Sequence, residues 1–92
     1  CGAVTAVCDD HKKLFTNLKP YVSPAISEVS NSISFTANRS NFISKVSEKS
    51  ILLTLDRIRS KSTLLCNLEK SNKIKLVGAM YNLQTGKVKI LN

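Results

Sequence analysis

The sequence predicts an α/β chain in which several helices are followed by an antiparallel β-hairpin. Apolar residues recur at helical spacing up to about residue 70. Two β-rich runs follow at residues 74–81 and 87–90, and the five-residue loop between them ends in Gly86. Because 92 residues with 42% hydrophobic content suffice for one small domain, we expect a single domain over residues 1–92.

Residues 2–18 predict one or two short helices. A polar stretch at residues 9–13 separates apolar residues that fall near helical spacing: Val4, Val7, Leu14, Phe15 and Leu18. Pro20 and Pro24 come next, and a proline disfavours helix in the residue before it. We therefore expect the chain to turn there and a new helix, opened by Pro24, to cover residues 25–34.

Residues 41–60 predict the strongest helix, capped by Asn38 or Ser40. Its polar residues leave one apolar stripe, made of Phe42, Ile43, Val46, Ile51, Leu53, Leu55 and Ile58. Ser62 is then expected to cap a further helix that carries Leu64, Leu65 and Leu68. Asn72 lies just past that helix, where a residue that tolerates the left-handed conformation is favoured.

The run at residues 77–79 is apolar at every position, which is typical of a strand covered by helices on both faces. Residues 87–90 instead alternate Lys with Val or Ile. A lone hairpin cannot supply cover on both faces, so we expect a larger sheet around it.

The net charge of +8 makes nucleic acid a candidate partner. Eleven of the 14 basic residues are Lys, scattered from Lys12 to Lys89, and only 5% of residues are aromatic. There is no dense Arg cluster to bind phosphates. We predict no nucleic-acid partner, and a basic nucleic-acid-binding module stays as an alternative that salt-dependent DNA retention would test.

No apolar run approaches the ~20 residues of a membrane span, and no signal-peptide pattern opens the chain. We therefore predict a chain without a membrane segment. Three cysteines are too few for a disulfide scaffold and indicate a reducing compartment, so a cytoplasmic location is expected. A lipid-bearing cysteine at position 1 is an alternative that only this residue supports.

Three segments in the right order resemble the beta-class carbonic anhydrases. Cys1-Gly2-Ala3 matches the end of the family's Gly-His-x-x-Cys-Gly-Ala turn, residues 41–62 look like its long helix, and residues 77–88 look like its closing strands. The match spans most of the chain, and the order and separation of the segments make it specific. Departures from the family occur at Lys61, Asn72 and residues 87–89, away from the metal site.

The resemblance implies the C-terminal part of that fold, in which the hairpin completes a mostly parallel sheet. It also implies zinc-dependent, reversible hydration of carbon dioxide to bicarbonate and a proton. Zinc supplies hydroxide for this chemistry by lowering the pKa of bound water from about 15.7 to about 7. The implied ligand in this chain is Cys1, at a predicted helix start that would help to keep the thiol ionised.

The family's other zinc-site residues are an earlier cysteine, followed at two residues by an aspartate and at four by an arginine, and the histidine of the turn. A catalytic zinc needs three protein ligands and one open position, and Cys1 is the single family ligand in this chain. We expect the chain to begin within the motif, with the other ligands upstream. On this interpretation, these residues alone are inactive and hold no catalytic residue.

Cys8 and His11 are three residues apart and would share a helix face near Cys1. Their spacing fits no common zinc signature, so we predict no substitute metal site. Cys8 is expected to be a small apolar filler and His11 a surface residue. Three further candidates are expected to be core or packing residues: Cys66, Tyr21 and Tyr81.

The resemblance also implies homodimers with active sites at the subunit boundary. The apolar stripe of residues 41–60 therefore suits an interface as well as a core. Two alternatives to an enzyme stay open: a non-catalytic carbonic-anhydrase-like module with a structural or interaction role, and the cytoplasmic domain of an anion transporter, which would have membrane spans upstream.

Overall fold

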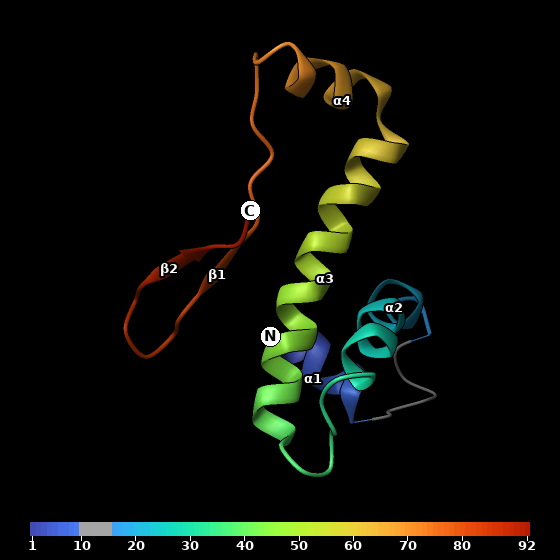
Figure 1. Ribbon diagram of the computed structural model, residues 1–92, viewed down its shortest axis with the longest axis vertical. Helices are drawn as coiled ribbons and strands as arrows, with labels where there is room; N and C mark the ends of the chain where they lie inside the picture. Colours follow the sequence, from blue (N-terminus) through green and yellow to red (C-terminus); the bar gives the residue numbers. More distant parts are fainter. Residues whose placement is uncertain (10–15) are drawn as a thin grey trace. The chain divides into compact units, whose positions relative to one another are not determined.

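The computed structural model describes residues 1–9 and 16–92. In these ranges the elements follow in the order α1 (Gly2–Cys8), α2 (Lys19–Ser30), α3 (Arg39–Lys61), α4 (Thr63–Lys70), β1 (Ala79–Tyr81) and β2 (Val88–Ile90) (Figure 1). The predicted order of helices followed by a hairpin is confirmed. The chain divides into two compact units, residues 1–50 and residues 51–92, and α3 runs through the division.

Helix α2 begins at Lys19, earlier than predicted, and includes both prolines. Pro20 lies in the first turn, where a missing N–H costs no helical hydrogen bond. Pro24 lies inside the helix and removes one such bond. The helix continues because Val22 and Ala25 are buried on either side of Pro24. The predicted interruption at the prolines is therefore wrong, and the helix ends at Ser30 instead of residue 34.

The core of residues 1–50 is built from one face of each of its helices. Its buried hydrophobic residues are Val4 from α1, Val22, Ala25 and Val29 from α2, and Phe42 and Val46 from α3. Helix α1 packs against α2. The ring of Phe42 also meets that of Phe35 edge to face, with the centroids 5.3 Å apart. The predicted helix over residues 2–18 is confirmed as α1 at its start, and its middle lies outside the described residues.

Polar side chains fix the ends of α3 and α4. Asn38 Oδ1 accepts a hydrogen bond from the backbone N–H of Asn41 at 3.2 Å, so Asn38 caps α3 and Ser40 lies inside the helix. Ser62 Oγ accepts from the backbone N–H of Leu65 at 3.2 Å, as predicted. Asn72 has a φ of 59°, which confirms the left-handed residue after α4.

Helix α4 contributes no buried residue. Leu64 is 69% exposed and Cys66 is half-buried. The prediction that Cys66 belongs to a core is therefore wrong, because residues 51–92 cover α4 only in part.

Strands β1 and β2 form an antiparallel hairpin that pairs Ala79 with Ile90, Met80 with Lys89 and Tyr81 with Val88. The loop is closed by Asn82, whose Oδ1 accepts from the backbone N–H groups of Gln84 at 2.9 Å and Thr85 at 3.1 Å. Gly86 follows with a φ of 71°, in the left-handed region that glycine adopts without strain.

One side of the hairpin approaches the second half of α3. A Cβ added to Gly78 would lie 2.6 Å from Ile51 Cγ2, so only glycine allows this contact. The opposite side is uncovered: Tyr81 is 61%, Val88 60% and Ile90 57% exposed. The apolar run at residues 77–79 predicted a strand that is covered on both faces. Within residues 51–92, only one face of the hairpin is covered.

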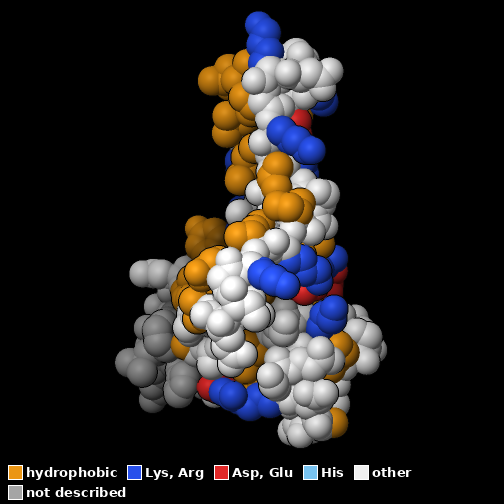
Figure 2. Space-filling model, turned by 90° about the vertical axis from the view of Figure 1, so that its left-hand side faces the viewer, with side chains coloured by type: hydrophobic (Ala, Val, Ile, Leu, Met, Phe, Trp, Pro, Cys, Tyr) orange, Lys and Arg blue, Asp and Glu red, His pale blue; other side chains and the backbone are white. Residues whose placement is uncertain are grey.

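Exposed apolar residues occur in both units, and Figure 2 shows orange hydrophobic side chains that reach the surface beside blue Lys and Arg side chains. Tyr21 is 54% exposed, so the prediction that it and Tyr81 are packing residues is wrong. None of the helices in the described part of the chain has the length and hydropathy needed to cross a membrane.

Candidate functional site

Cys1, the predicted zinc ligand, lies at the N-cap of α1 and is exposed. Its carbonyl oxygen accepts hydrogen bonds at 3.0 Å from both the backbone N–H and the hydroxyl of Thr5. Those bonds hold the backbone of Cys1 at the helix start and leave the thiol accessible. The predicted placement of Cys1 at a helix start is confirmed.

Cys8 ends the same helix and is half-buried. Burial raises the pKa of the Cys8 thiol, and the neighbouring negative charge of Asp9 raises that pKa further, although Arg39 acts in the opposite direction. The thiol is therefore neutral near pH 7, and a neutral thiol is a poor metal ligand.

Arg39, at the start of α3, binds the carboxylate of Asp9 with two nitrogens. Nη2 lies 2.8 Å from Oδ1 and 2.6 Å from Oδ2, while Nε lies 3.1 Å from Oδ1. This contact raises the pKa of Arg39 and ties the end of α1 to α3. The contact engages both oxygens of the Asp9 carboxylate, which gives Asp9 a structural role.

The described residues do not form a zinc site by themselves. No group of three or more His, Cys, Asp or Glu side chains in residues 1–9 and 16–92 could hold a metal ion. His11, the third member of the substitute site considered from the sequence, lies outside the described residues. Because a catalytic zinc needs three protein ligands, the donor set around Cys1 does not fit zinc without further ligands.

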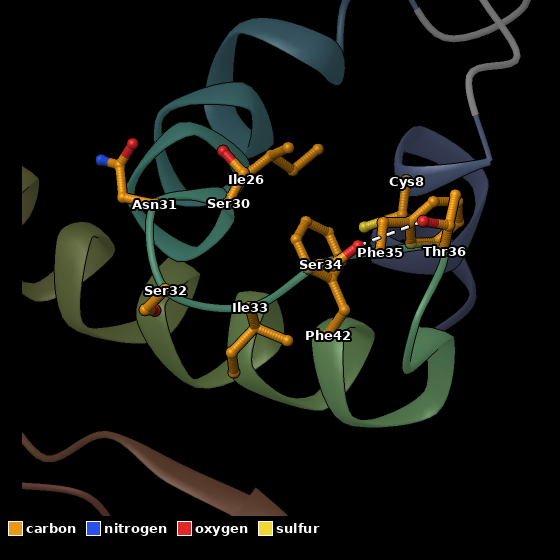
Figure 3. Close-up of a pocket in the computed structure, with 10 residues that line it drawn as sticks. All are labelled: Cys8, Ile26, Ser30, Asn31, Ser32, Ile33, Ser34, Phe35, Thr36 and Phe42. Atoms are coloured by element: carbon orange, nitrogen blue, oxygen red, sulfur yellow. Dashed lines mark hydrogen bonds between the residues drawn. The ribbon is translucent and has the colours of Figure 1, made fainter.

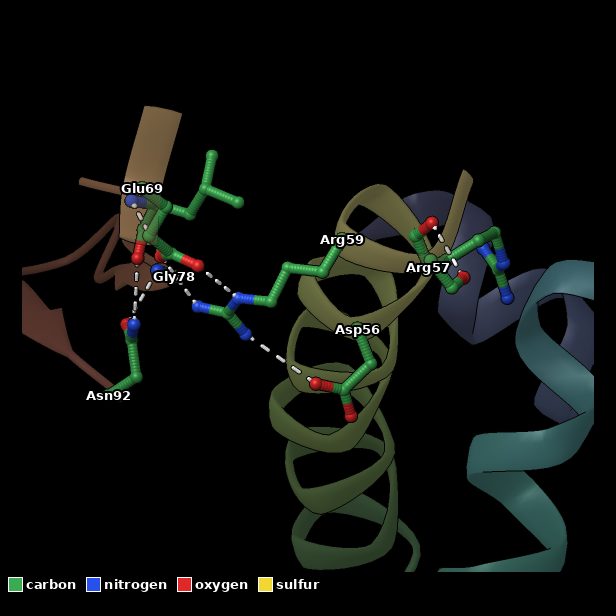
Figure 4. A network of polar contacts seen from close by, with 8 residues as sticks. Asp56, Arg57, Arg59, Glu69, Gly78 and Asn92 are labelled. Atoms are coloured by element: carbon green, nitrogen blue, oxygen red, sulfur yellow. Dashed lines mark hydrogen bonds and ion pairs between the residues drawn. The ribbon is translucent and has the colours of Figure 1, made fainter. Parts of the chain in front are cut away.

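A second polar cluster in residues 51–92 links α3, α4 and the hairpin (Figure 4). Arg59 Nε donates to Glu69 Oε1 at 2.6 Å and Nη2 donates to Oε2 at 3.0 Å. Glu69 Oε2 also accepts from the backbone N–H of Leu76 at 3.3 Å. Hydrogen bonding to Arg59 lowers the pKa of Glu69.

Asn92 closes the open end of the hairpin in the same cluster. Its Oδ1 accepts from the N–H of Gly78 at 2.7 Å, and its Nδ2 donates to the carbonyl of Leu76 at 2.9 Å. These groups organise the fold of residues 51–92. In the sequence, the Arg59–Glu69 pair is indicated only by opposite charges on either side of Ser62, where α3 ends and α4 begins.

An open cavity in residues 1–50, lined by Cys8 and residues of α2, α3 and the loop between them, was not predicted from the sequence (Figure 3). The loop at residues 31–36 combines Ser and Thr with Ile33 and Phe35. These two apolar residues in a polar loop are the sequence feature that could have indicated the cavity.

The sequence model of the family described as carbonic anhydrase matches residues 1–88. A comparison with curated proteins gave no significant match, and neither did a comparison with solved structures. The family match includes Cys1, all four described helices, β1 and the first residue of β2.

Proposed function

The chain belongs to the beta-class carbonic anhydrase family, and we propose that it supplies Cys1 to a zinc site of that family. The observation that carries this proposal is the match over residues 1–88, which includes the exposed cysteine at the start of α1. The bound metal would supply hydroxide near neutral pH for hydration of carbon dioxide to bicarbonate. The remaining ligands would come from polypeptide outside these 92 residues.

On this proposal, the part played by these residues is positional. The Thr5 contacts hold the backbone of Cys1, and α1 packs on α2, whose residues Val22 and Ala25 are buried. Because the backbone that carries the thiol is held in place, metal binding at Cys1 costs less backbone conformational entropy. The 92 residues alone are expected to hydrate no carbon dioxide.

The hairpin supports the further proposal that residues 51–92 complete a larger, mostly parallel sheet. In an antiparallel pair, alternate residues direct their backbone groups away from the partner strand. Leu91 N bonds Gly78 O and Asn82 N bonds Lys87 O, so the N–H and C=O groups of Ala79 and Tyr81 face outward. A two-stranded hairpin is marginally stable alone, and a further strand at this edge would stabilise it.

The zinc content of the purified 92-residue protein tests the proposal directly. We expect less than one zinc per chain and no carbon dioxide hydration in a stopped-flow assay with a pH indicator. Stoichiometric zinc together with activity would contradict the proposal, because it would require a complete site within these residues.

A matched pair of variants tests Cys1 in the longest natural product of the gene that contains these residues. Cys1→Ser should lose most of the bound zinc and the hydration activity, because it removes one ligand of the proposed site. Cys66→Ser should keep both, since Cys66 lies half-buried in α4. Equal zinc content in the two variants would show that Cys1 is not a zinc ligand.

A non-catalytic carbonic-anhydrase-like interaction module is the second candidate function. Such a module needs no metal, and residues 1–9 and 16–92 contain no group of side chains that could hold one. Homodimerisation is part of both proposals and is measured by sedimentation of the purified protein. A longer gene product that binds no zinc, with or without Cys1, would favour the module over the enzyme.

A further inference from the structure

The cavity in residues 1–50 has a volume of about 650 Å³. Cys8 comes from the end of α1, Ile26 and Ser30 from α2, and Phe42 from α3, while the loop at residues 31–36 forms the rest (Figure 3). Pockets for small molecules in proteins usually measure about 300–1,000 Å³. This cavity therefore has the size of a small-molecule site.

Apolar side chains from three elements line the cavity. They are Ile26 of α2, Ile33 and Phe35 of the loop, and Phe42 of α3. Phe42 is 3% exposed and meets Phe35 edge to face, so these two rings form a fixed wall. Such a wall favours a flat apolar ring or a short hydrocarbon chain.

Four hydroxyl groups of the same loop and of α2 and the Asn31 side chain supply the polar part of the lining, and most of the hydroxyl protons already make hydrogen bonds. Ser30 Oγ donates to the carbonyl of Ser27 at 3.0 Å, and Ser32 Oγ donates to that of Val29 at 3.2 Å. Each hydroxyl has one proton and two lone pairs, so these oxygens keep acceptor capacity only.

Ser34 and Thr36 share one hydrogen bond across 3.1 Å, and Ser34 Oγ also accepts from the backbone N–H of Ala37 at 3.4 Å. One proton of this pair is left to donate. The four hydroxyl groups therefore present mainly acceptor oxygens, and the Asn31 amide adds both donors and an acceptor to the lining. The hydroxyl oxygens can bind a ligand that carries a hydrogen-bond donor.

None of the described residues that line the cavity is Lys, Arg, Asp, Glu or His. Burial also raises the pKa of Cys8, which keeps this thiol neutral near pH 7. An ion would gain no opposite charge from these residues in return for the water that it gives up at the apolar wall. The lining therefore favours a neutral ligand.

We propose that this cavity binds a small uncharged molecule that combines an apolar ring or chain with a hydroxyl or amide N–H group. The site is separate from Cys1 and does not depend on zinc. Its residues all belong to residues 1–50, in which α1, α2 and the start of α3 form the apolar core.

Methyl NMR of the isoleucine-labelled 92-residue protein tests the proposal with three probes of similar size: 2-naphthol, 2-methoxynaphthalene and 2-naphthoate. The methyl signals of Ile26 and Ile33 should shift saturably with 2-naphthol, whereas those of Ile74 and Ile90, in the other unit, should not. The methoxy compound lacks the donor and should bind about fivefold more weakly, the effect of one hydrogen bond. The naphthoate should bind weakest.

Two variants sharpen the test. Ile26→Trp fills the cavity and should abolish the saturable shifts at Ile33, whereas Leu64→Trp, at a site that is 69% exposed in α4, should leave them unchanged. The double variant Ser30→Ala, Ser32→Ala removes acceptors and should bring the affinities of 2-naphthol and 2-methoxynaphthalene together. This variant keeps the proposal testable where Ile26→Trp fails to fold.

The proposal is overturned by any of three results. These are the absence of saturable shifts at Ile26 and Ile33, equal shifts at Ile74 and Ile90, and naphthoate binding as tight as that of 2-naphthol. Zinc content plays no part in this test, so its outcome is independent of the proposed carbonic anhydrase function.

Discussion

Residues 1–50 bury Val22, Ala25 and Val46 in a common core, whereas Leu55 is the one buried hydrophobic residue among residues 51–92. The second unit instead relies on directional polar contacts, chiefly those of Arg59, Glu69 and Asn92. Apolar burial contributes about 25 cal/mol per Å², while partly exposed ion pairs contribute about 0–1 kcal/mol each. The first unit is therefore stabilised mainly by its own apolar core, and the second mainly by polar contacts between its elements.

The largest effect is expected in the core of the first unit. Phe42→Ala removes a ring that is 3% exposed and its edge-to-face contact with Phe35. We expect the free energy of unfolding to fall by about 3–5 kcal/mol, measured by urea denaturation.

Leu83→Ala is the matched control, because Leu83 is 89% exposed in the hairpin loop. It should change stability by less than about 0.5 kcal/mol. Equal losses for the two variants would mean that the first unit has no core of its own.

A smaller effect is expected where the hairpin meets α3. Gly78→Ala places a Cβ 2.6 Å from Ile51 Cγ2 and 3.2 Å from Leu55 Cδ1, so either the backbone at Gly78 or these side chains must move. Overpacking of this kind costs about 1–3 kcal/mol, which amide exchange of the hairpin would detect. Gly2→Ala is the control, since nothing lies within 4 Å of its added Cβ. Unchanged exchange at residues 79–90 in Gly78→Ala would show that the contact is not formed.

The smallest effect concerns pH. The pKa of Glu69 is lowered in the folded chain, chiefly by its hydrogen bond to Arg59, so the unfolded chain binds a proton more readily. The stabilisation by Glu69 is therefore complete above the unfolded pKa of about 4.3 and is lost as pH falls through the folded value. NMR signals of residues 74–92 should report this acid-induced loss.

Glu69→Gln should remove that pH dependence and leave the signals of residues 1–9 unchanged. If Glu69→Gln shows the same acid-induced change at residues 74–92 as the unsubstituted protein, other carboxylates cause that change.

Much of the local structure could be predicted from individual residues. Ser62 and Asn72 mark the two ends of α4 because capping and the left-handed conformation depend on short-range hydrogen bonds and sterics. Gly86 and the alternation at residues 87–90 predicted the hairpin for similar reasons. The predicted helix break at the prolines was wrong because burial of Val22 and Ala25 outweighs the single backbone hydrogen bond lost at Pro24.

The candidate site was predicted less completely. Cys1 at a helix start follows from the motif, and the structure confirms its position. The Arg39–Asp9 contact and the cavity beside Phe35 join residues about 30 positions apart, and no local pattern encodes such pairing.

Neighbouring residues and the motif at Cys1 were enough to predict the family, the order of the elements, the caps and the candidate ligand. Three features depend instead on the folded chain: which apolar residues are buried, which side of the hairpin meets α3, and the cavity in residues 1–50. Burial depends on contacts between distant segments. Val46 and Val88 are the same residue type, yet Val46 is buried and Val88 is 60% exposed because different surroundings pack on them.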